Sequence, residues 1–448
     1  MTLPGQQMTA ARKKVYPRHS PGRFRRIRNV LSLLLQALLF SLPWLQWHSR
    51  QAVLADLPGR KFYLFGLVLH PQDNYFLLLI TLIAVLLLSG VSTLAGRMWC
   101  GFACPQTIFT QAFIWVERYF EGDRAARMRL DKAPWDGRKL RLKLAKWATW
   151  TGMSIWLGIT FAGYFLPIRE LMGQLTSASV DLNTGLVLVF FTGISLFDFG
   201  YFREQFCQHI CPYARLQSTM LDTDSIIVGY DSRRGEPRAK LKQSDRGACV
   251  DCSLCVQVCP AGIDIRDGLQ SECIGCTACV DACDSIMDKV KQPRGLIRFT
   301  SLNELEGRPT RVFRPRLLIY SAALILLTSL LLYLIVIRSP IGLECERQVK
   351  PGGQIAATTA DGRISNVFKV HVVNRLAEPA QLRIGVDGLV QAEVLGTKEL
   401  DLASGQVKEM QLLVVVPASL ERGIHSFRFL ATSSVGVQVS SQATFFVP

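Results

Sequence analysis

The chain has 448 residues, which is enough for about two to four domains. Hydrophobic residues make up 49% of it, yet its formal net charge is +16, and the apolar residues gather in blocks that basic residues separate. This combination indicates a membrane protein whose basic loops face the cytoplasm. It disfavours a nucleic-acid-binding protein, because the basic residues flank apolar runs and no recognition module is visible.

Five apolar runs are long enough to cross a bilayer with help from their flanks. They follow a basic amino-terminal arm at residues 1–28 and lie at 29–47, 75–96, 147–167, 183–202 and 317–337. The first run could instead be a secretory signal. Residues 61–69 are apolar but too short to span, which is typical of an interfacial or re-entrant segment. We therefore predict five transmembrane α-helices, four of them in a membrane region at 29–202 and the fifth at 317–338.

Lysine and arginine are unevenly distributed between these runs. They concentrate in the arm, in residues 97–146 and in residues 203–316, whereas 48–74 and 168–182 are nearly bare of them. The positive-inside rule then places the amino terminus and residues 203–316 in the cytoplasm, and residues 339–448 on the other side of the membrane. The reducing cytoplasm also keeps thiols free to bind iron.

Eight of the 13 cysteines form two runs with the same spacing, C-x2-C-x2-C-x3-C. This is the spacing of two-cluster bacterial ferredoxins, in which the fourth cysteine of each run binds the cluster of the other run. We therefore predict a cytoplasmic ferredoxin-like block at about 245–290 with two 4Fe–4S clusters. Their ligands would be Cys249, Cys252, Cys255 and Cys283 for one, and Cys273, Cys276, Cys279 and Cys259 for the other. Zinc sites are usually spaced differently, and disulfides need an oxidising compartment.

Four further cysteines form two matching motifs, each of the form C-x3-C-P. Cys100 and Cys104 follow the second apolar run, and Cys207 and Cys211 follow the fourth, so a unit of two spans and a thiol pair repeats. Proline disfavours helix at the residue before it and suits the first position of a new helix. We therefore predict a helix–break–helix corner at each motif, with both thiols on one face and a helix dipole that lowers their pKa values.

Paired thiolates at these corners suit a soft ion such as Cu(I), an additional cluster, or a dithiol–disulfide couple. His209, inside the second motif, is an optional nitrogen ligand, although the first motif contains no histidine. Asp198, near the end of the fourth run, is either a functional carboxylate or an ion-pair partner of Arg203. The residues leave these alternatives open, and they do not decide whether the four thiols form one site or two.

Residues 339–448 have nearly balanced charge and contain segments in which apolar and polar residues alternate. Such segments lie at 367–373, 381–386, 409–415, 425–430 and 437–446, with turn residues between them. About seven short strands over this length predict an extracytoplasmic immunoglobulin-like β-sandwich. Cys345 stands alone in this region; it could link two chains into a homodimer, but a free thiol is the simpler reading.

Four stretches of the chain resemble the family of cytochrome c oxidase accessory proteins called CcoG, FixG or RdxA. They are REQFCQHICPYARLQS at 203–218, VGYDSRRGEPR at 228–238, CIGCTACVDACD at 273–284 and PRGLIR at 293–298. The specific resemblance extends from about residue 99 to residue 298, and the plan of spans, ferredoxin block and outer sandwich resembles the family overall. The amino-terminal arm and the surroundings of Cys345 show no such match.

The resemblance implies a protein of the bacterial inner membrane, with its carboxy-terminal domain in the periplasm, that is needed to assemble the cbb3-type oxidase and reduces Cu(II) to Cu(I). In that case Cys100, Cys104, Cys207 and Cys211 form the copper site, and the clusters supply electrons from a cytoplasmic donor. Oxidase-assembly or copper-transport proteins would be its partners, besides the lipid bilayer. Two alternatives are a quinol-linked electron-transfer subunit and a non-enzymatic redox sensor or assembly scaffold.

Overall fold

The computed structural model of the protein describes residues 14–448 apart from positions 48, 49, 60, 66, 70–72, 242, 244, 349–355, 360, 377, 434 and 435. The chain forms two compact units. The first contains the long helices and the ferredoxin block, within residues 1–45, 53–56 and 75–329. The second contains residues 46–52 and 57–74 together with residues 330–448, which include the β-sandwich.

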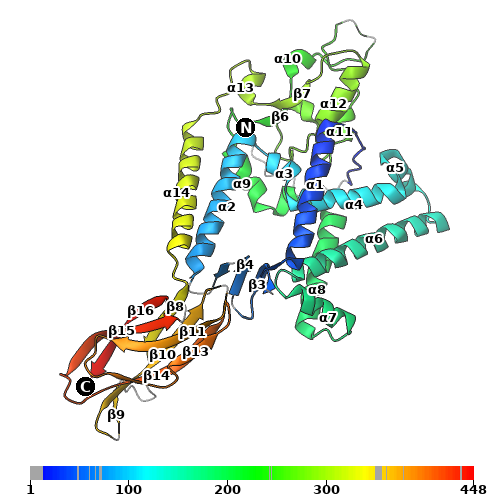
Figure 1. The fold of residues 1–448 in the computed structure, drawn as a ribbon. Coiled ribbons are helices and arrows are strands. Elements are labelled where there is room, and N and C mark those ends of the chain that lie inside the picture. Colours follow the sequence, from blue (N-terminus) through cyan, green and yellow to red (C-terminus); the bar gives the residue numbers. More distant parts are fainter. Residues whose placement is uncertain are drawn as a thin grey trace. The chain divides into compact units, whose positions relative to one another are not determined.

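Long helices form most of the first unit (Figure 1). They are α1 (Arg23–Ser41), α2 (Asn74–Ala95), α4 (Pro105–Glu121), α6 (Gly137–Ala162), α8 (Leu182–Ser195) and α14 (Pro315–Ile337), the last of which leads into the second unit. Shorter helices connect them: α3 (Met98–Phe102), α5 (Arg124–Lys132), α7 (Ile168–Thr176) and α9 (Pro212–Met220). Two π-helical segments follow α8, namely η3 (Leu196–Phe202) and η4 (Phe206–Ile210).

Four helices of the described chain are long and apolar enough to cross a membrane. They are Arg23–Trp44, Asn74–Ala95, Leu182–Phe202 and Pro315–Ile337, and they cover four of the five predicted spans. The remaining prediction, 147–167, falls mainly on the 26-residue helix α6. Threonine, serine, glycine and tryptophan interrupt the aliphatic residues of α6, so its composition is less apolar than that of the other four. Length and composition therefore support four spans where the sequence predicts five.

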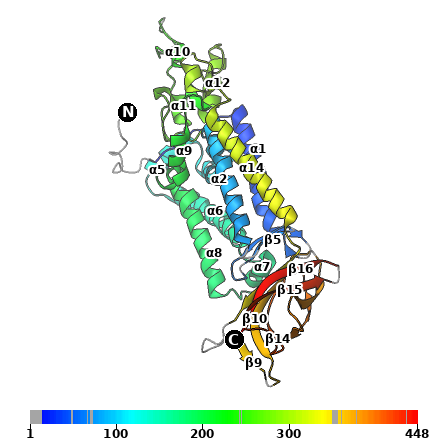
Figure 2. The same ribbon diagram turned by 90° about the vertical axis from the view of Figure 1, so that its left-hand side faces the viewer.

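Helix α6 packs against both α4 and α8, and α7 connects α6 to α8 (Figure 2). The core beside them consists of Phe109, Phe113, Val116, Trp150, Leu157 and Phe199. A buried charge network adjoins this core: Glu117, 1% exposed, pairs with Arg127 at 3.2 Å and with Arg203 at 2.9 Å. Lys146 adds a third cation at 3.6 Å. The predicted basic loop at 97–146 is thus folded helical structure rather than a solvated connection.

The ferredoxin block lies between two short paired strands. Strand β6 (Ile227–Tyr230) pairs antiparallel with β7 (Ile297–Thr300), and Asp231 and Arg298 beside them form a 2.9 Å ion pair. Between the strands lie α10 (Ser232–Gly235), α11 (Leu254–Gln257), η5 (Ile265–Asp267) and α12 (Ala278–Lys289), and α13 (Leu302–Leu305) follows them. Both strands overlap stretches that carry the family resemblance, and their pairing joins the two ends of the block.

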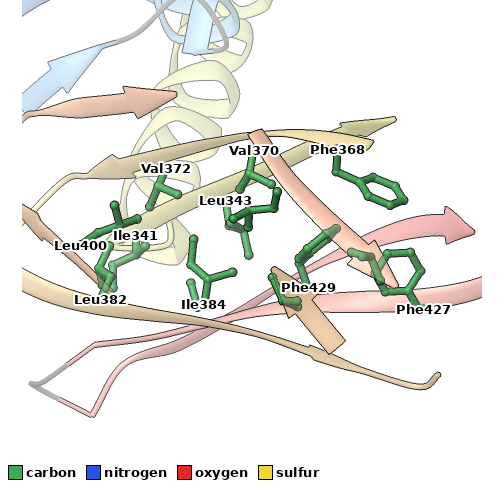
Figure 3. Close-up of a cluster of buried hydrophobic side chains, with 14 of the residues drawn as sticks. Ile341, Leu343, Phe368, Val370, Val372, Leu382, Ile384, Leu400, Phe427 and Phe429 are labelled. Carbon is green, nitrogen blue, oxygen red and sulfur yellow. The ribbon is translucent and has the colours of Figure 1, made fainter. Parts of the chain in front are cut away.

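The second unit contains a sandwich of two sheets, whose inward side chains form a common core (Figure 3). One sheet has the order β12 (Glu393–Leu395), β14 (Val407–Val416), β10 (Ile364–Asn374) and β8 (Ile341–Arg347), with β9 (Ala356–Thr358) paired to β10. The other has the order β13 (Glu399–Leu402), β11 (Ala380–Asp387), β15 (Gly423–Ser433) and β16 (Gln438–Val447). The five segments predicted from alternation fall on β10, β11, β14, β15 and β16. Cys345 of β8 packs against the core as a free thiol, and burial raises its pKa to about 12.

Two short strands lie in the apolar stretch at 61–69, for which the sequence predicts an interfacial or re-entrant segment. Strands β4 (Lys61–Leu64) and β5 (Leu67–Leu69) pair antiparallel within the second unit. Val68 and Leu69 are buried, and Lys61 Nζ donates to the carbonyl oxygen of Gly405 at 3.4 Å. The second unit therefore buries part of this stretch, while Leu64 and Phe65 stay exposed. The short strands β1 (Gln46–Trp47), β2 (Arg50–Gln51) and β3 (Val53–Asp56) precede it, after the 3-10 turn η1 (Leu42–Trp44).

Candidate iron–sulfur and thiol site

The two cysteine runs of the ferredoxin block have the same backbone conformation. The residues just before and just after the second cysteine of each run have positive φ: Asp251 at 46° and Ser253 at 53°, then Gly275 at 67° and Thr277 at 58°. Helices α11 and α12 begin directly after these residues. Non-glycine residues seldom adopt positive φ, and left-handed positions of this kind can turn neighbouring N–H groups toward one anion. Equal spacing is thus accompanied by equal loop geometry.

The fourth cysteine of each run lies with the first three of the other run. One set of thiols that interact electrostatically and line one cavity consists of Cys249, Cys252, Cys255 and Cys283. The other set of interacting thiols consists of Cys259, Cys273, Cys276 and Cys279. Four cysteine thiolates are the usual donor set of a 4Fe–4S cluster. The two sets therefore fit a pair of clusters with the crossover that the spacing predicts.

Two further residues adjoin the first of these sets, and the sequence did not identify either as a site residue. The Tyr230 hydroxyl donates to Glu236 Oε1 at 3.3 Å and also lies within hydrogen-bonding reach of the thiol of Cys249. Arg266 lines the same cavity and forms a 2.7 Å ion pair with Asp251 of the first cysteine loop. Groups that hydrogen-bond with ligand sulfurs tune a cluster's reduction potential. Tyr230 could have been found, since it lies in the 228–238 stretch, but nothing in the sequence pattern singles out Arg266.

Both C-x3-C-P motifs form the predicted break between two helices. Cys104 is extended (φ −65°, ψ 127°) and caps α4, which starts at the proline after it. Cys211 is also extended (φ −63°, ψ 112°) and caps α9 in the same way. The first cysteine of each pair differs, because Cys100 lies on the α-helical turn α3 and Cys207 on the π-helical segment η4. The predicted common helix face is therefore wrong, since the second thiol of each pair lies outside the preceding helix.

The four corner thiols lie near one another, although the two pairs come from distant parts of the sequence. Cys100 interacts electrostatically with Cys104 and Cys211. Cys207 interacts with Cys104, Cys100 and Cys211. The structure thus brings the two pairs together, but it does not decide between one site and two. Among the described residues, no three Cys, His, Asp or Glu side chains are arranged to hold one metal ion as they stand, so a shared ion requires the thiols to rotate toward it.

Cys100, Cys104 and Cys207 have raised pKa values instead of the lowered values that the helix dipoles predicted. Burial raises the pKa of Cys100 and of Cys207 to about 12. Burial also raises the pKa of Cys104, although the backbone N–H groups of Gln106 and Thr107 at the start of α4 oppose it. The helix terminus therefore has its expected effect at Cys104, but desolvation outweighs it. A metal ion must displace the thiol protons to make these groups thiolates near neutral pH.

Asp198 does not form the ion pair with Arg203 that was one of its two alternatives. Gln106 Nε2 donates to Asp198 Oδ1 at 2.9 Å and to the Arg203 carbonyl oxygen at 3.0 Å. The Arg203 guanidinium pairs with Glu117 instead. Gln106 thereby ties the first corner to the segment that precedes the second. His209 is exposed, and the thiol interactions described above do not include it.

The first corner packs directly against the second cysteine loop of the ferredoxin block. A Cβ added to Gly101 would lie 2.5 Å from the carbonyl oxygen of Gly275, and one added to Gly275 would lie 2.9 Å from that of Arg97. The Arg97 guanidinium donates to the carbonyl oxygen of Cys273 at 3.2 Å and to that of Ala214, on α9, at 3.0 Å. Glycine permits this close approach because it lacks Cβ. Both corners and a cluster-binding loop are therefore held together.

Buried Gln217 supports the first corner from the side of the second. The thiol of Cys100 donates to Gln217 Oε1 at 3.4 Å. The amide group of Gln217 donates to the Gly96 carbonyl oxygen at 2.8 Å and to Ser92 Oγ at 3.2 Å, both near the end of α2. Gln217 is fully buried. The sequence did not identify it as a site residue, although it lies in the 203–218 stretch that carries the family resemblance.

Helix α1 also holds the ferredoxin block, which the sequence did not predict (Figure 1). It begins at Arg23, six residues before the predicted apolar run. The backbone N–H groups of Phe24 and Arg25 donate to the carboxylate of Asp281, on α12, at 3.1 and 2.8 Å. Arg28 donates to the Cys276 carbonyl oxygen at 2.6 Å. Part of the predicted arm is therefore folded against the second cysteine loop.

Comparison with protein families identifies the cysteine-rich and carboxy-terminal regions. A 4Fe–4S dicluster domain model matches residues 202–302, and a 4Fe–4S binding domain model matches residues 77–121, which include the first corner. A model described as the IG-like fold at the C-terminal of FixG matches residues 331–448.

Several known proteins are similar over most of the chain. Protein RdxB of Cereibacter sphaeroides is 37% identical over 441 residues, which cover 94% of this chain and 90% of RdxB. Nitrogen fixation protein FixG of Rhizobium meliloti is 34% identical over 424 residues, which cover 85% of this chain and 80% of FixG. A crystal structure of a FixG-related protein from Vibrio parahaemolyticus covers 24% of this chain and 97% of its own, at 18% identity and a TM-score of 0.22. The chain belongs to the FixG/Rdx family of multi-pass membrane iron–sulfur proteins, with a 4Fe–4S dicluster domain and a FixG-type immunoglobulin-like domain.

Proposed function

We propose that this protein is an iron–sulfur oxidoreductase that reduces Cu(II) to Cu(I) for the assembly of a cbb3-type cytochrome c oxidase. The observation that carries the proposal is the convergence of four corner thiols beside a cluster-binding loop. Copper is the substrate, and each ion takes up one electron. Thiolate ligands favour the soft reduced ion over Cu(II), so a site of this composition stabilises the product of the reaction.

The residues have distinct roles in this proposal. Cys100, Cys104, Cys207 and Cys211 bind the copper ion, and the two crossed sets of four cysteines bind the clusters. 4Fe–4S clusters supply one-electron transfer when they are bound. Arg97 and the contact between Gly101 and Gly275 keep the copper site next to the second cysteine loop. Tyr230 and the burial of the cysteines set the electrostatic environment of the sulfur ligands.

The geometry also supports the predicted topology, in which both corners face the cytoplasm. The thiols of the two corners interact, so both lie on one side of the membrane, and the chain between Cys104 and Cys207 must cross it an even number of times. Helix α8 with η3 is a candidate span in that interval, and α6 packs against it. A helix of 26 residues is about 39 Å long, enough to cross. We therefore infer that α6 is the missing fifth span and that the sandwich is periplasmic.

One observation favours a second candidate function. The 4Fe–4S binding domain model includes the first corner. If the corner thiols hold an additional cluster instead of copper, the protein is an electron-transfer subunit that passes electrons between a membrane donor such as quinol and a partner protein. The two candidates differ in the metal that the corners bind.

The test is anaerobic purification of the wild type, the Cys100→Ser/Cys207→Ser double variant and Cys345→Ser, followed by iron, sulfide and copper analysis. Cu(II) reduction is then measured with dithionite as donor and a Cu(I)-selective chelator, with rates corrected for the protein-free reaction. We expect the double variant to keep its iron and to lose copper binding and at least 90% of the reduction (roughly tenfold, the least that loss of a metal ligand should cost). Cys345→Ser is the matched control, because this thiol lies in the sandwich, and it should behave as the wild type. Unchanged copper handling in the double variant would refute copper reduction at the corners, and a loss of iron there would favour the additional cluster.

A further inference from the structure

A cavity of about 490 Å³ lies between α1, α4 and the two cysteine loops of the ferredoxin block. Its volume is within the range of about 300–1,000 Å³ that proteins use for small ligands. Gln36 on α1 and Gln106 on α4 line it from the two helices, while Ile274 lines it from the second cysteine loop. The corner thiol of Cys207 also borders it. None of the roles proposed above uses this space.

The lining of the cavity carries a surplus of positive charge. Its cationic side chains are Arg18, Arg25, Arg28, Arg118 and Arg127, with His19 beside them. Among the described lining residues, Glu204 is the one carboxylate. Arg127 pairs with Glu117, whereas the other four arginines form no ion pair within 4.0 Å in the part of the chain that the structure describes. Such a lining favours an anionic occupant.

Two of these arginines are almost fully buried and have a guanidinium N–H without an acceptor. Arg28 is 6% exposed and Arg127 is 1% exposed, and neither Nε has a hydrogen-bond partner. Arg28 Nη1 donates to the Cys276 carbonyl oxygen, and Arg127 donates through Nη1 to Glu117 and through Nη2 to the Pro17 carbonyl oxygen at 2.6 Å. Leaving a buried charged donor unpaired is costly. An anion in the cavity would offset the charge of Arg28, which has no carboxylate within 4.0 Å in the described part of the chain.

Two further features point to an anion. Burial lowers the pKa of His19, and the neighbouring charges of Arg25 and Arg118 lower it further, against the opposing effect of Asp123. The cavity extends along the 17-residue helix α4 as far as Arg118, and Gln106 and Thr107 in the first turn form part of its wall, so the positive end of the helix dipole lies beside it.

Apolar side chains also line the cavity, which narrows the class of ligand. They are Leu33 of α1 and Ile114 and Trp115 of α4. Leu33 is 68% exposed and Trp115 is 57% exposed, and α1 is a candidate membrane span. An occupant with both a phosphate group and an apolar chain fits both kinds of lining. Basic pockets between membrane helices on the cytoplasmic side commonly bind lipid headgroups.

We propose that this cavity binds the phosphate headgroup of an anionic membrane phospholipid, whose acyl chains leave between Leu33 and Trp115. Arg28 contacts both the cavity and the carbonyl oxygen of Cys276, and the preceding turn of α1 holds Asp281 of α12. A bound headgroup would therefore hold α1, α4 and the second cysteine loop together. This site does not depend on the identity of the metal at the corners.

The test uses the full-length protein in a neutral detergent, with native mass spectrometry to count bound phosphatidylglycerol. The variants are Arg118→Gln and the Arg18→Gln/Arg118→Gln pair, which remove charge at partly exposed positions. Arg141→Gln, on the exposed side of α6, is the matched control for loss of one positive charge. We expect phosphatidylglycerol to bind the wild type and Arg141→Gln equally, and at least tenfold more weakly to the paired variant. Zwitterionic phosphatidylcholine should not compete.

Each other outcome counts against the proposal. Equal lipid binding by the paired variant and the control would overturn it. Displacement of the lipid by millimolar inorganic phosphate would show that the anion is a soluble phosphate rather than a headgroup. Arg28→Gln gives an independent check, because thermal unfolding should show lipid stabilisation of the wild type that this variant lacks even if the variant itself is less stable. Iron content, measured in parallel, separates a failure of this site from loss of the clusters.

Discussion

The ferredoxin block and the corner region each repeat a cysteine spacing, but they repeat their backbone to different degrees. The two ferredoxin runs share positive φ at the same two positions, although the residues there differ: Asp251 and Ser253 in one, Gly275 and Thr277 in the other. The two corners share the extended cysteine before proline, but one is entered from an α-helical turn and the other from a π-helical segment.

The difference shows where a motif alone determines structure. In a ferredoxin run, three closely spaced cysteines must all face one cluster, so few backbone paths satisfy the spacing. In a corner, the proline fixes the residue before it, but the position of the first cysteine depends on what the incoming helix packs against. At the second corner that helix carries η3 and Arg203, whose φ is 54° and whose guanidinium is held by Glu117. Packing therefore determines where the first cysteine of a corner lies, which the cysteine spacing alone does not.

The largest expected effect comes from cysteines that test the crossover in the ferredoxin block. Cys249→Ser and Cys283→Ser should remove the same cluster, although the two positions belong to different runs, and Cys259→Ser should remove the other. Iron should fall from about eight to about four atoms per chain in each variant. Electron paramagnetic resonance of the reduced protein distinguishes the two clusters. If Cys283→Ser lost the same cluster as Cys259→Ser, the crossed assignment of ligands would be wrong.

A smaller but still large effect is expected at Glu117, which orients the second corner through Arg203. Burial by itself would raise the pKa of this carboxyl group, but Arg203, Lys146 and Arg127 together lower it from 4.5 to about 2. Glu117→Gln leaves these cations without their common partner and should destabilise the helical unit by about 3–5 kcal/mol. Thermal unfolding measures this, and Glu399→Gln, in an exposed ion pair of the sandwich, should change nothing measurable.

The sign of the pH dependence follows from the same carboxylate. Because the folded pKa of Glu117 lies below its unfolded value, its contribution is fully present above about pH 4.5 and is lost as the pH falls through 2. Wild type should therefore lose stability in that window more steeply than Glu117→Gln. Parallel curves for the two proteins would show that the network does not depend on this charge.

Gly101→Ala tests the contact between the first corner and the second cysteine loop of the ferredoxin block. The added Cβ would lie 2.5 Å from the Gly275 carbonyl oxygen, so the corner and the loop must move apart. We expect copper reduction to fall roughly tenfold or more and the helical unit to lose about 1–3 kcal/mol of stability, with iron content unchanged. Gly152→Ala is the matched control, because a Cβ at that helical position meets nothing within 4 Å. Equal rates in the two variants would mean that the close contact is not needed for the reaction.

Much of this organisation could be predicted from the sequence, and the failures have physical causes. The cysteine runs, the proline corners and the long sandwich strands depend on local spacing or alternation, so each was recognisable. The pairing of β4 with β5 was not predicted, because the composition of a short apolar run does not show whether it forms paired strands. The thiol pKa was predicted in the wrong direction because a sequence shows the helix terminus but not the depth of burial. The contacts of Gly101, Arg97 and Arg28 with the cysteine loop join residues far apart in the chain, which no local pattern specifies.

The smallest predicted effect concerns Tyr230, which distinguishes the two otherwise equal halves of the ferredoxin block. Its hydroxyl donates to Glu236 Oε1 at 3.3 Å and is also within hydrogen-bonding reach of Cys249, in the set that Cys283 completes. A hydrogen bond donated to a ligand sulfur stabilises the more negative, reduced cluster. Removing one bond of about 1 kcal/mol in Tyr230→Phe should lower that cluster's potential by roughly 40 mV, since 59 mV corresponds to a tenfold change for one electron. Redox titration followed by electron paramagnetic resonance resolves this, and the other cluster should keep its potential. If both potentials moved equally, the effect would come from the block as a whole rather than from this one contact.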